Sequence, residues 1–430
     1  MSNVSSLATL ARTASRALSA LSASAKDEAI EAIARALLSH SDAIANANRL
    51  DMDDAEQAGL AAPLKKRLLY DASKIQNSVV GLRSLALLPD PVGRTLMSTE
   101  MDEGLLLYRV TCPIGVIGVI FESRPDALVQ IAALCLKAGN AVLLKGGSEA
   151  SRTNRILSDI IAEASLSAGI PAGWIALLSS RAEVDEMLRL DESIDLIIPR
   201  GSNAFVQHIM RNSSIPVLGH ADGVCHVYVN EEADPSMALR IAVDSKVQYV
   251  AVCNAAETIL IDRSIATNFL PALANALAAK NVVLHGDDEA RAIFPMETVD
   301  DWHKEYLDYE VSVHIVAGKD EAIDHINRYG SGHTDTIITE NKDIAERFLR
   351  EVDSGSVMWN CSTRFSDGYK YGFGAEVGIS TAKIHARGPV GLDGLVTYKY
   401  KLYGKGQIVE DYASGKRTFT HRPIPDEGKS

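Results

Sequence analysis

The chain has 430 residues, of which 47% are hydrophobic and 23% charged, as in an ordinary globular protein. This length is enough for two or three domains. The formal net charge of -13 argues against nucleic acid or an anionic membrane as the main partner, because both require a basic surface. An anionic small molecule stays open as a substrate, since a local group of arginines and lysines can outweigh the overall sign.

The cysteines are spread widely, odd in number and free of Cys-X-X-Cys pairs: Cys112, Cys135, Cys225, Cys253 and Cys361. This usage indicates free thiols in a reducing compartment, not a disulfide framework or a zinc site. The N-terminal segment lacks the basic start and apolar block of a secretory signal, and a transit peptide fits it less well than an amphipathic helix does. No apolar run reaches the roughly 18 residues of a membrane span. We therefore expect a cytoplasmic protein.

The first part of the chain predicts helices up to about residue 90, because apolar residues recur three or four positions apart with charges between them. Short β-branched apolar runs and helical patterns then alternate. The predicted strands are 105–110, 115–121, 141–145, 175–178 and 195–198, and the predicted helices between them are 127–138 and 152–168. Such alternation indicates a parallel sheet with helices on both faces.

The same alternation starts again near residue 226, which indicates a second α/β domain. Its predicted strands are 226–230, 257–261 and 281–285, and its predicted helices follow Asp234 and cover 264–279. The last forty residues differ, because TYKYKLYG and RTFTHRP alternate polar and apolar residues and contain aromatics. We predict that these two segments are strands that are exposed or paired with a partner.

One cysteine stands out by its neighbours. Cys253 and Asn254 form a polar pair in KVQYVAVCNAAE, between a run expected as a strand and a run expected as a helix. There the sulfur would lie near backbone amides, which lower the pKa of a thiol and hold a developing oxyanion. The spacing alone leaves two readings open: Cys253 is a nucleophile, or it is a small buried apolar side chain, as most free cysteines are.

Several longer stretches resemble one enzyme family. They are PIGVIGVIFESRPDA (113–127), LCLKAGNAVLLKGGSEASRTN (134–154), DLIIPRGSNAF (195–205), CNAAETILI (253–261), EVDSGSVMWNCSTRFSDG (351–368) and GAEVGISTAKIHARGPVGL (374–392). With similar segments from about residue 5 to 400, they resemble the gamma-glutamyl phosphate reductases of the aldehyde dehydrogenase superfamily.

The resemblance implies an aldehyde dehydrogenase-like α/β fold, with two parallel-sheet domains, a small β oligomerisation arm and an active site in the cleft between the domains. The cofactor-binding domain would cover 1–228, with 99–112 contributing to the arm. The catalytic domain with the nucleophilic cysteine would cover 229–392, and 393–430 would form the C-terminal arm and tail.

By the same resemblance, Cys253 matches the nucleophile, and Asn254 fits an orienting role and a structural role equally well. The implied reaction is NADPH-dependent reduction of L-glutamate 5-phosphate to L-glutamate 5-semialdehyde in proline biosynthesis. The thiolate displaces phosphate, and a hydride then reduces the thioester. Hydrolytic relatives carry a water-activating Glu where this chain has VLGHADGVC (217–225), with no carboxylate at that place and Asp222 close by. Its absence favours reduction over hydrolysis.

Two positions depart from the wider pattern. Glu122 stands where many aldehyde dehydrogenases have an Asn that donates to the oxyanion, as it does in the reductase family. Because a carboxylate cannot donate, we expect the backbone N–H of Cys253 to do more of that work. Val250 replaces the usual Pro, which removes a constraint on φ shortly before the nucleophile.

The cofactor site is implied by resemblance, since the chain has no GxGxxG motif. Lys145 would reach the adenosine ribose. Ser148 takes the place of a Glu of NAD-preferring relatives, and a hydroxyl beside a lysine accepts a 2′-phosphate that a carboxylate would repel, which favours NADPH. Gly201 and Ser202 would meet the pyrophosphate, although an ordinary turn and cap explains them equally well. Glu305 would hold the nicotinamide ribose, unless it is one more solvated surface Glu.

The substrate has a phosphate and an α-carboxylate, so cationic side chains are the candidates for binding it. Arg124 and Arg364 can bind either group in a bidentate manner, and Ser362 and Thr363 can add hydroxyl donors. Each arginine fits equally well as the partner of a nearby acid such as Asp126.

Other basic residues have no assigned role. The family-like segment 382–388 contains Lys383, His385 and Arg387. Three further histidines show no metal-ligand spacing, so we expect no metal site and treat them as structural or as supporting the site: His220, His226 and His333.

Two alternatives stay open beside the reductase. One is an NAD-dependent aldehyde oxidiser of the same fold, and the other is a catalytically silent binding protein, which would be expected to lack the nucleophile. The resemblance implies a homo-oligomer and a possible transient glutamate kinase partner, and no nucleic-acid or membrane partner. Because the chain starts at Met1 and contains no kinase segment, we expect a stand-alone reductase.

Overall fold

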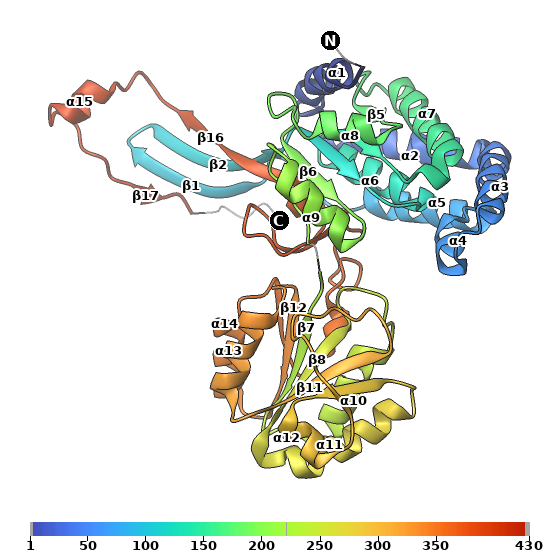
Figure 1. Cartoon of the computed structure of the whole chain (residues 1–430). Helices are drawn as coiled ribbons and strands as arrows, with labels where there is room; N and C mark the ends of the chain where they lie inside the picture. Colours follow the sequence, from blue (N-terminus) through green and yellow to red (C-terminus); the bar gives the residue numbers. More distant parts are fainter. Residues whose placement is uncertain (1–2, 221, 426–430) are drawn as a thin grey trace. The chain divides into compact units, whose positions relative to one another are not determined.

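The computed structural model describes residues 3–220 and 222–425, which divide into two compact units (Figure 1). The first unit holds the chain up to Gly201, then Ile209–Val217, and the chain from Gly391 on. The second unit holds Ser202–His208 and Leu218–Val390. The predicted assignment of cofactor binding to one domain and of the nucleophile to the other stays a prediction.

The first unit opens with helices, as the apolar spacing predicted. They are α1 (Asn3–Leu18), α2 (Ala23–Ser39), α3 (Ser41–Gln57), α4 (Ala62–Leu68) and α5 (Ala72–Ala86). The side chains of Ser22 and Asp71 cap α2 and α5 by accepting backbone N–H groups of the first turn. Helix α2 packs against α5 and α7.

A four-stranded parallel sheet follows, in the order β5-β4-β3-β6. Its strands are β3 (Val116–Ile120), β4 (Ala141–Lys145), β5 (Ile175–Leu177) and β6 (Leu196–Pro199), and its helices are α6 (Pro125–Lys137), α7 (Ser151–Ser167) and α8 (Arg181–Met187). Every residue of β3 and β4 is buried, as expected of continuous apolar runs in a parallel sheet. The predicted strands and helices of this region are confirmed, with ends that differ by one or two residues.

The second unit is built on a seven-stranded parallel sheet in the order β10-β9-β11-β8-β7-β12-β13. Its strands are β7 (Cys225–Val229), β8 (Ala256–Asp262), β9 (Val283–Gly286), β10 (Glu297–Thr298), β11 (Glu310–Val316), β12 (Thr334–Ile338) and β13 (Ser356–Trp359). Its helices are α10 (Pro235–Val247), α11 (Arg263–Ala278), α12 (Asp288–Ile293), α13 (Lys319–Tyr329) and α14 (Lys342–Glu351). The predicted strands 226–230, 257–261 and 281–285 and the predicted helices after Asp234 and over 264–279 are confirmed, whereas β10 to β13 and α12 to α14 were not predicted.

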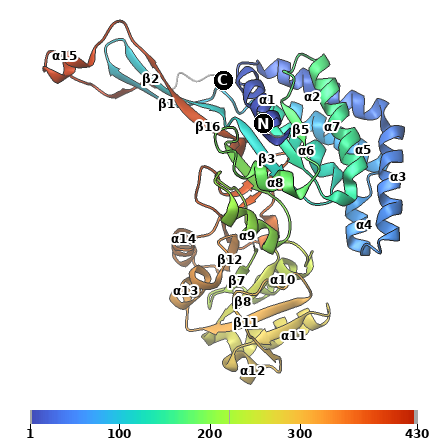
Figure 2. The same ribbon diagram turned by 45° about the horizontal axis from the view of Figure 1, so that its top comes forward.

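This sheet carries one layer of helices on each face, α10 to α12 on one and α13 with α14 on the other (Figure 2). Side chains alternate between the two layers along each strand. Val227 and Val229 pack into the cluster with α10 and α11, whereas Tyr228 between them packs against Phe348 of α14. The strands also carry buried polar side chains that are paired, such as Glu257 of β8 with Lys246 of α10 and Asp335 of β12 with His226.

A separate antiparallel sheet forms the arm of the first unit, in the order β16-β2-β1-β17. Its strands are β1 (Thr95–Asp102), β2 (Leu105–Pro113), β16 (Val396–Tyr403) and β17 (Arg422–Pro423), with the short helix α15 (Val409–Ala413) before β17 (Figure 1). The strand predicted in TYKYKLYG is confirmed.

The strand predicted over RTFTHRP is wrong for most of its length, because only Arg422 and Pro423 pair with β1. Side chains and single backbone hydrogen bonds, such as that from Thr420 N–H to the carbonyl of Met101 at 2.8 Å, hold the rest of this tail in place. Arg417 binds the carboxylate of Asp102 at 2.7 Å, and the ring of Phe419 stacks on Tyr412 with 4.3 Å between centroids. Within residues 3–220 and 222–425, none of the helices combines the length and apolar character that a membrane span requires.

Candidate active site

Cys253 lies in a turn between α10 and β8, half-buried. The expected order, a strand before Cys253 and a helix after it, is wrong. Only Lys246 and Val247 of the run that precedes the cysteine belong to α10, and residues 248–252 form a loop. Lys246 is fully buried and pairs with Glu257 of β8 at 2.6 Å. The apolar residues Val250, Ala251 and Val252 give this loop the appearance of a strand in the sequence.

The backbone of the Cys253 turn is in close contact with Gly223. A Cβ atom at position 223 would lie 2.0 Å from the carbonyl oxygen of Cys253, so only glycine fits there. The same carbonyl accepts a hydrogen bond from the thiol of Cys225, with 3.1 Å between the two atoms. The backbone N–H of Gly223 donates to Oε1 of Glu305 at 2.9 Å. The loop before β7 therefore fixes the position of the nucleophile's backbone.

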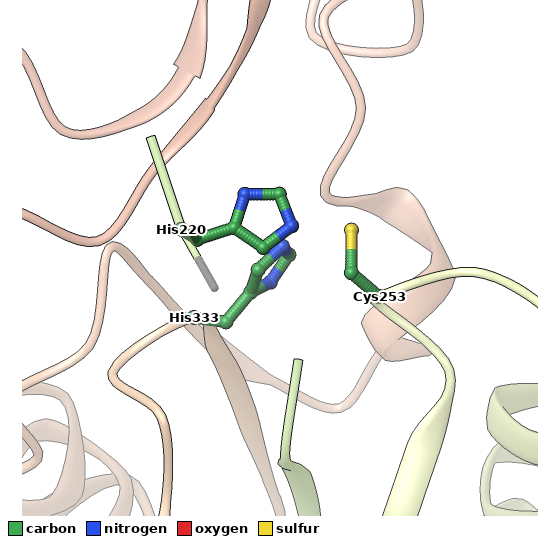
Figure 3. A group of neighbouring side chains, drawn as sticks. All are labelled: His220, Cys253 and His333. Atoms are coloured by element: carbon green, nitrogen blue, oxygen red, sulfur yellow. The ribbon is translucent and has the colours of Figure 1, made fainter. Parts of the chain in front are cut away.

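Two histidines lie beside the sulfur. One possible ligand atom from each of His220, Cys253 and His333 lies within 4.8 Å of the other two (Figure 3). The rings of His220 and His333 meet edge to face, with 4.9 Å between centroids. Nδ1 of His220 is 2.9 Å from the carbonyl oxygen of Ile379, and because a carbonyl only accepts, this nitrogen carries the proton. In a neutral ring Nε2 then has a lone pair.

His333 is fully buried at the start of β12, and burial together with the nearby His220 holds its pKa well below the ordinary value. Its ring is therefore neutral. Nδ1 lies 2.8 Å from the hydroxyl of Thr334, and Nε2 is buried without a hydrogen-bond partner among the residues that the structure describes. Both histidines were expected to be structural or supporting, and the structure brings both to the candidate nucleophile.

Asn254 connects the turn to the loop after β13. Its side-chain amide donates to the carbonyl oxygen of Ser366 at 2.7 Å, which holds the short helix η2 (Thr363–Phe365) against the Cys253 turn. In that loop Ser362 is hydrogen-bonded to Ser245 of α10 at 3.2 Å, and the hydroxyl of Thr363 is buried without a partner among the described residues. Asn254 thus joins the loop of Ser362, Thr363 and Arg364 to the turn of the candidate nucleophile, and the role of these three residues in substrate binding stays a prediction.

Arg364 is the cation of this loop. Its Nε donates to the side chain of Gln248 at 3.0 Å, which fixes the guanidinium. Partial burial lowers the pKa of Arg364, and the negative charge of the Cys253 thiolate acts in the opposite direction as the largest raising contribution. The two groups therefore interact electrostatically, and a thiolate near a guanidinium is stabilised.

Arg124, the second predicted substrate cation, is the N-cap residue of α6 in the first unit and forms an ion pair with Asp126 at 2.7 Å. This is the pairing with a nearby acid that the sequence left open. Two basic residues of segment 382–388 are engaged in the same way, since Lys383 and Arg387 both bind Asp353. Glu122 is 3.5 Å from Arg67.

The predicted cofactor residues lie in both units. The carboxylate of Glu305 accepts hydrogen bonds from the side-chain amide of Asn203 at 2.7 Å and from the backbone N–H of Gly223. It therefore connects three segments of the second unit and is not a solvated surface residue. Gly201 and Ser202 lie in the turn between β6 and α9 (Asn203–Asn212). Lys145 ends β4, where burial lowers its pKa and its amino group donates to the carbonyl of Gly146.

A pocket of about 290 Å³ in the first unit lies at the carboxyl ends of β4 and β5. Its lining is Gly146, Gly147, Ser148, Ser151, Arg152, Asn154, Arg155, Leu177, Leu178 and Ser179. Two arginines and no acidic residue occur in this set. Arg152 is held by Asp51 and Asp54, whereas Arg155 donates to the hydroxyl of Ser179 at 3.1 Å. The pocket therefore suits an anionic group near Ser148.

Sequence patterns had not assigned His220, His333, Gly223 or Asn203 to the site. The available signal was the position of His220, Gly223 and His333 in the sequence, because each of them shortly precedes a predicted or observed strand of one parallel sheet. Parallel strands that are neighbours in a sheet bring their preceding loops to one edge. Using that signal requires the strand order β8-β7-β12, which periodicity does not give.

Comparisons with known proteins agree with this geometry. The model of the aldehyde dehydrogenase family matches residues 1–304. A protein of Acetivibrio thermocellus described as gamma-glutamyl phosphate reductase is 62% identical over 401 residues, which cover 93% of both chains. Another from Cyanothece sp. with the same description is 51% identical over 404 residues, again 93% of each.

A crystal structure of gamma-glutamyl phosphate reductase from Thermotoga maritima superposes with a TM-score of 0.93 at 38% identity and covers 95% of this chain and 100% of that one. An acetylating aldehyde dehydrogenase from Geobacillus thermoglucosidasius, at 17% identity and a TM-score of 0.64, covers 94% and 97% and shows the shared fold alone.

Proposed function

Because the chain belongs to the gamma-glutamyl phosphate reductases of the aldehyde dehydrogenase superfamily, we propose that it reduces L-glutamate 5-phosphate to L-glutamate 5-semialdehyde in proline biosynthesis. The observation that carries this proposal is the half-buried thiol of Cys253 with two imidazoles within 4.8 Å. A thiolate is a strong nucleophile toward an acyl phosphate, and its product is a thioester on the enzyme.

His220 is the group that receives the thiol proton in this proposal. Its Nδ1–H is donated to the carbonyl of Ile379, so the other nitrogen is the basic one. The sulfur of Cys253 then bonds to the acyl carbon while the carbon–oxygen bond to phosphate breaks. Phosphate leaves with the electron pair and takes the proton from His220. After this step the thioester is in place and the imidazole is neutral again.

The loop of η2 is the site for the anionic substrate. Arg364 lies near enough to Cys253 to respond to its charge, and the buried hydroxyl of Thr363 has no partner among the described residues. A guanidinium and a hydroxyl are suited to a phosphate or carboxylate. Because Asn254 holds this loop at Ser366, a substrate bound to the loop would keep its acyl carbon next to the sulfur of Cys253.

NADPH is the reductant in this proposal. The pocket beside Ser148 fits a 2′-phosphate, because its lining has arginines and lacks carboxylates. Ser148 and Arg155 would bind that phosphate, and Glu305 would hold the nicotinamide ribose through the oxygen atoms that now accept from Gly223 and Asn203. When bound, NADPH supplies the hydride that converts the thioester carbonyl to the aldehyde.

The test uses the reverse reaction, glutamate 5-semialdehyde oxidation with NADP in the presence and absence of phosphate. The wild-type chain should reduce NADP only when phosphate or arsenate is present. Cys253→Ser should lose at least about 10³-fold in kcat while keeping its fold, since a serine hydroxyl is not ionised at neutral pH. Phosphate-independent activity would instead indicate an aldehyde oxidiser, and a fully active Cys253→Ser would refute the mechanism.

We also propose that the arm pairs with a second copy of the chain. Strand β16 is the edge of the four-stranded arm sheet, and Tyr398, Tyr400, Leu402 and Tyr403 on it are exposed. An exposed apolar edge strand is suited to pairing. Sedimentation analysis of the wild type and of Tyr400→Lys should show an oligomer that dissociates in the variant, and an unchanged mass would contradict this proposal.

A further inference from the structure

The group of His220, Cys253 and His333 has the composition of a site for a transition-metal ion. Each side chain comes from a different loop at the amino end of a strand, before β7, β8 and β12, which are neighbours in one parallel sheet. One ligand atom from each lies within 4.8 Å of the others (Figure 3). A rigid sheet edge thus presents one sulfur and two imidazole nitrogens to a common point.

The hydrogen bonds around the two imidazoles match those of metal-binding histidines. Such a histidine almost always gives its second ring nitrogen to a carbonyl, carboxylate or water, which fixes its tautomer. Here Nδ1 of His220 donates to the carbonyl of Ile379 at 2.9 Å, and Nδ1 of His333 is 2.8 Å from the hydroxyl of Thr334. Both rings can therefore direct Nε2 toward an ion.

His333 supplies the second, independent observation. It is 1% exposed, and its Nε2 is buried without a hydrogen-bond partner in the part of the chain that the structure describes. Such an unsatisfied nitrogen is rare, and a missing ion is one of the explanations for it. The burial that leaves this nitrogen unpaired also keeps the ring neutral, the state in which imidazole binds metals.

The donor set selects the class of ion. One thiolate with two imidazoles suits Zn²⁺ and the related Co²⁺ and Cd²⁺, whereas Mg²⁺ and Ca²⁺ prefer oxygen. Bond lengths of about 2.0–2.1 Å to nitrogen and about 2.3 Å to sulfur place tetrahedral ligand atoms roughly 3.3–3.7 Å apart. The three atoms must therefore approach by about 1 Å, which rotation of the half-buried Cys253 and His220 side chains can supply.

We propose that these three residues bind a single Zn²⁺-class ion, and that this ion reversibly silences the enzyme by occupying the sulfur of Cys253. Binding releases the thiol proton to solvent, and the coordinated thiolate shares its charge with the ion, which weakens it as a nucleophile and blocks its approach to the acyl phosphate. Three protein ligands leave a fourth position for water. The binding half of this proposal stands on the geometry alone, and the inhibition half rests on the proposed role of Cys253 as nucleophile.

The first experiment measures binding without any reaction. The chelator-treated full-length protein is titrated with Zn²⁺ alone by calorimetry and with Co²⁺ by absorption spectroscopy. We expect one ion per chain, a thiolate-to-cobalt charge-transfer band, and no heat with Mg²⁺. Cys253→Ser should abolish the charge-transfer band, and His220→Gln and His333→Gln should each weaken Zn²⁺ binding by more than about tenfold.

Cys112→Ser is the matched control, because Cys112 is another half-buried free thiol but lies in β2 of the arm. It should bind Zn²⁺ like the wild type. If His333→Gln fails to fold, His220→Gln, at a half-exposed position, still tests the site. Absence of Zn²⁺ binding, or binding that survives both Cys253→Ser and His220→Gln, would overturn the proposal.

The second experiment adds activity. Zn²⁺ should abolish phosphate-dependent NADP reduction, and excess chelator should restore it in full. An enzyme that is active but indifferent to Zn²⁺ contradicts the metal site and leaves the proposed function intact. A protein that binds one Zn²⁺ at Cys253 but is inactive without metal contradicts the proposed function and leaves the metal site intact.

Discussion

The Cα atom of Gly223 lies so close to Cys253 that a methyl group on it would be 2.0 Å from the carbonyl oxygen and 2.5 Å from the Cα atom of that cysteine. The obstructing atoms are backbone, which cannot rotate out of the way. Gly223→Ala must therefore displace the nucleophile's turn. We predict a fall in kcat of roughly 100-fold or more, since a 1 Å misplacement of a reacting group has about that effect. Steady-state assays of NADP reduction measure it.

Gly81→Ala is the control for that substitution. Gly81 lies within α5, and nothing is within 4 Å of the position that its Cβ would take. Activity should be unchanged, and the free energy of unfolding should rise by about 0.5–1 kcal/mol, because alanine is the better helix former. Equal activities of the two variants would mean that the close contact at Gly223 does not position Cys253.

His220→Gln tests the proton acceptor. Glutamine can still donate to the carbonyl of Ile379 but cannot take a proton, so kcat/KM should fall by about 10²–10⁴-fold near neutral pH. At higher pH the thiol ionises without help, so activity and iodoacetamide labelling of Cys253 should both recover. A loss of the same size at every pH would mean that His220 has only a structural role.

The strands of the first parallel sheet and β7, β8 and β9 of the second were predictable from short apolar runs, whereas β10 to β13 were not predicted. Strand β12 begins with Thr334, Asp335 and Thr336, so its burial does not appear as an apolar run.

The cluster at Cys253 was not predictable, because His220 and His333 come from loops far from it in sequence and meet only through the order β8-β7-β12. The run before Cys253 gave a wrong local prediction, since residues 248–252 include the apolar Val250, Ala251 and Val252 but form a loop after α10. The strand predicted over RTFTHRP was wrong at Arg417, because the ion pair of this residue with Asp102, and not a strand ladder, holds it.

Ser148→Glu tests the cofactor preference. A carboxylate at the edge of the pocket would repel a 2′-phosphate. The kcat/KM with NADPH should therefore fall at least about tenfold, which corresponds to about 1.4 kcal/mol, whereas the kcat/KM with NADH should stay the same or rise. Ser148→Ala is the matched control, because it removes the hydroxyl without adding charge and should lose less. If both variants keep the wild-type ratio of NADPH to NADH activity, Ser148 does not face the 2′-phosphate.

Lys246→Met tests the buried ion pair behind the nucleophile. Both side chains are fully buried, and burial already raises the pKa of Glu257 to about 7 against the opposing attraction of Lys246. Without the lysine the carboxyl group is left uncompensated, so stability should fall by about 3–5 kcal/mol in urea unfolding.

The double variant Lys246→Met/Glu257→Leu removes both charges and should recover most of that loss. Lys65→Met, which breaks an exposed pair with Glu56, should change stability by less than about 1 kcal/mol. If the double variant were as unstable as the single one, the loss of stability would come from the missing ion pair itself and not from the unpaired carboxyl group of Glu257.

His325 makes the second unit sensitive to acid. It lies on α13 among His226, His314 and Trp302, with ring centroids 5.5, 4.8 and 5.1 Å away. Burial first, and then the nearby His226 and His314, lower its pKa to about 2. In the unfolded chain His325 takes up a proton near pH 6.5, whereas in the folded protein it stays neutral at this pH. Stability is therefore complete above about pH 6.5 and declines as the pH falls below it, by up to about 1.4 kcal/mol per pH unit.

His325→Phe should remove this contribution, because phenylalanine keeps the aromatic packing and does not titrate. Hydrogen exchange of β7 and α13 between about pH 7 and pH 5 measures the local opening free energy of the second unit, and its decline should be shallower in the variant by up to about one proton. His40→Gln, at an exposed position between α2 and α3, should leave that decline unchanged. If His325→Phe declined as steeply as the wild type, acid would be acting through other groups, and the buried, neutral state of His333 would be the next to test.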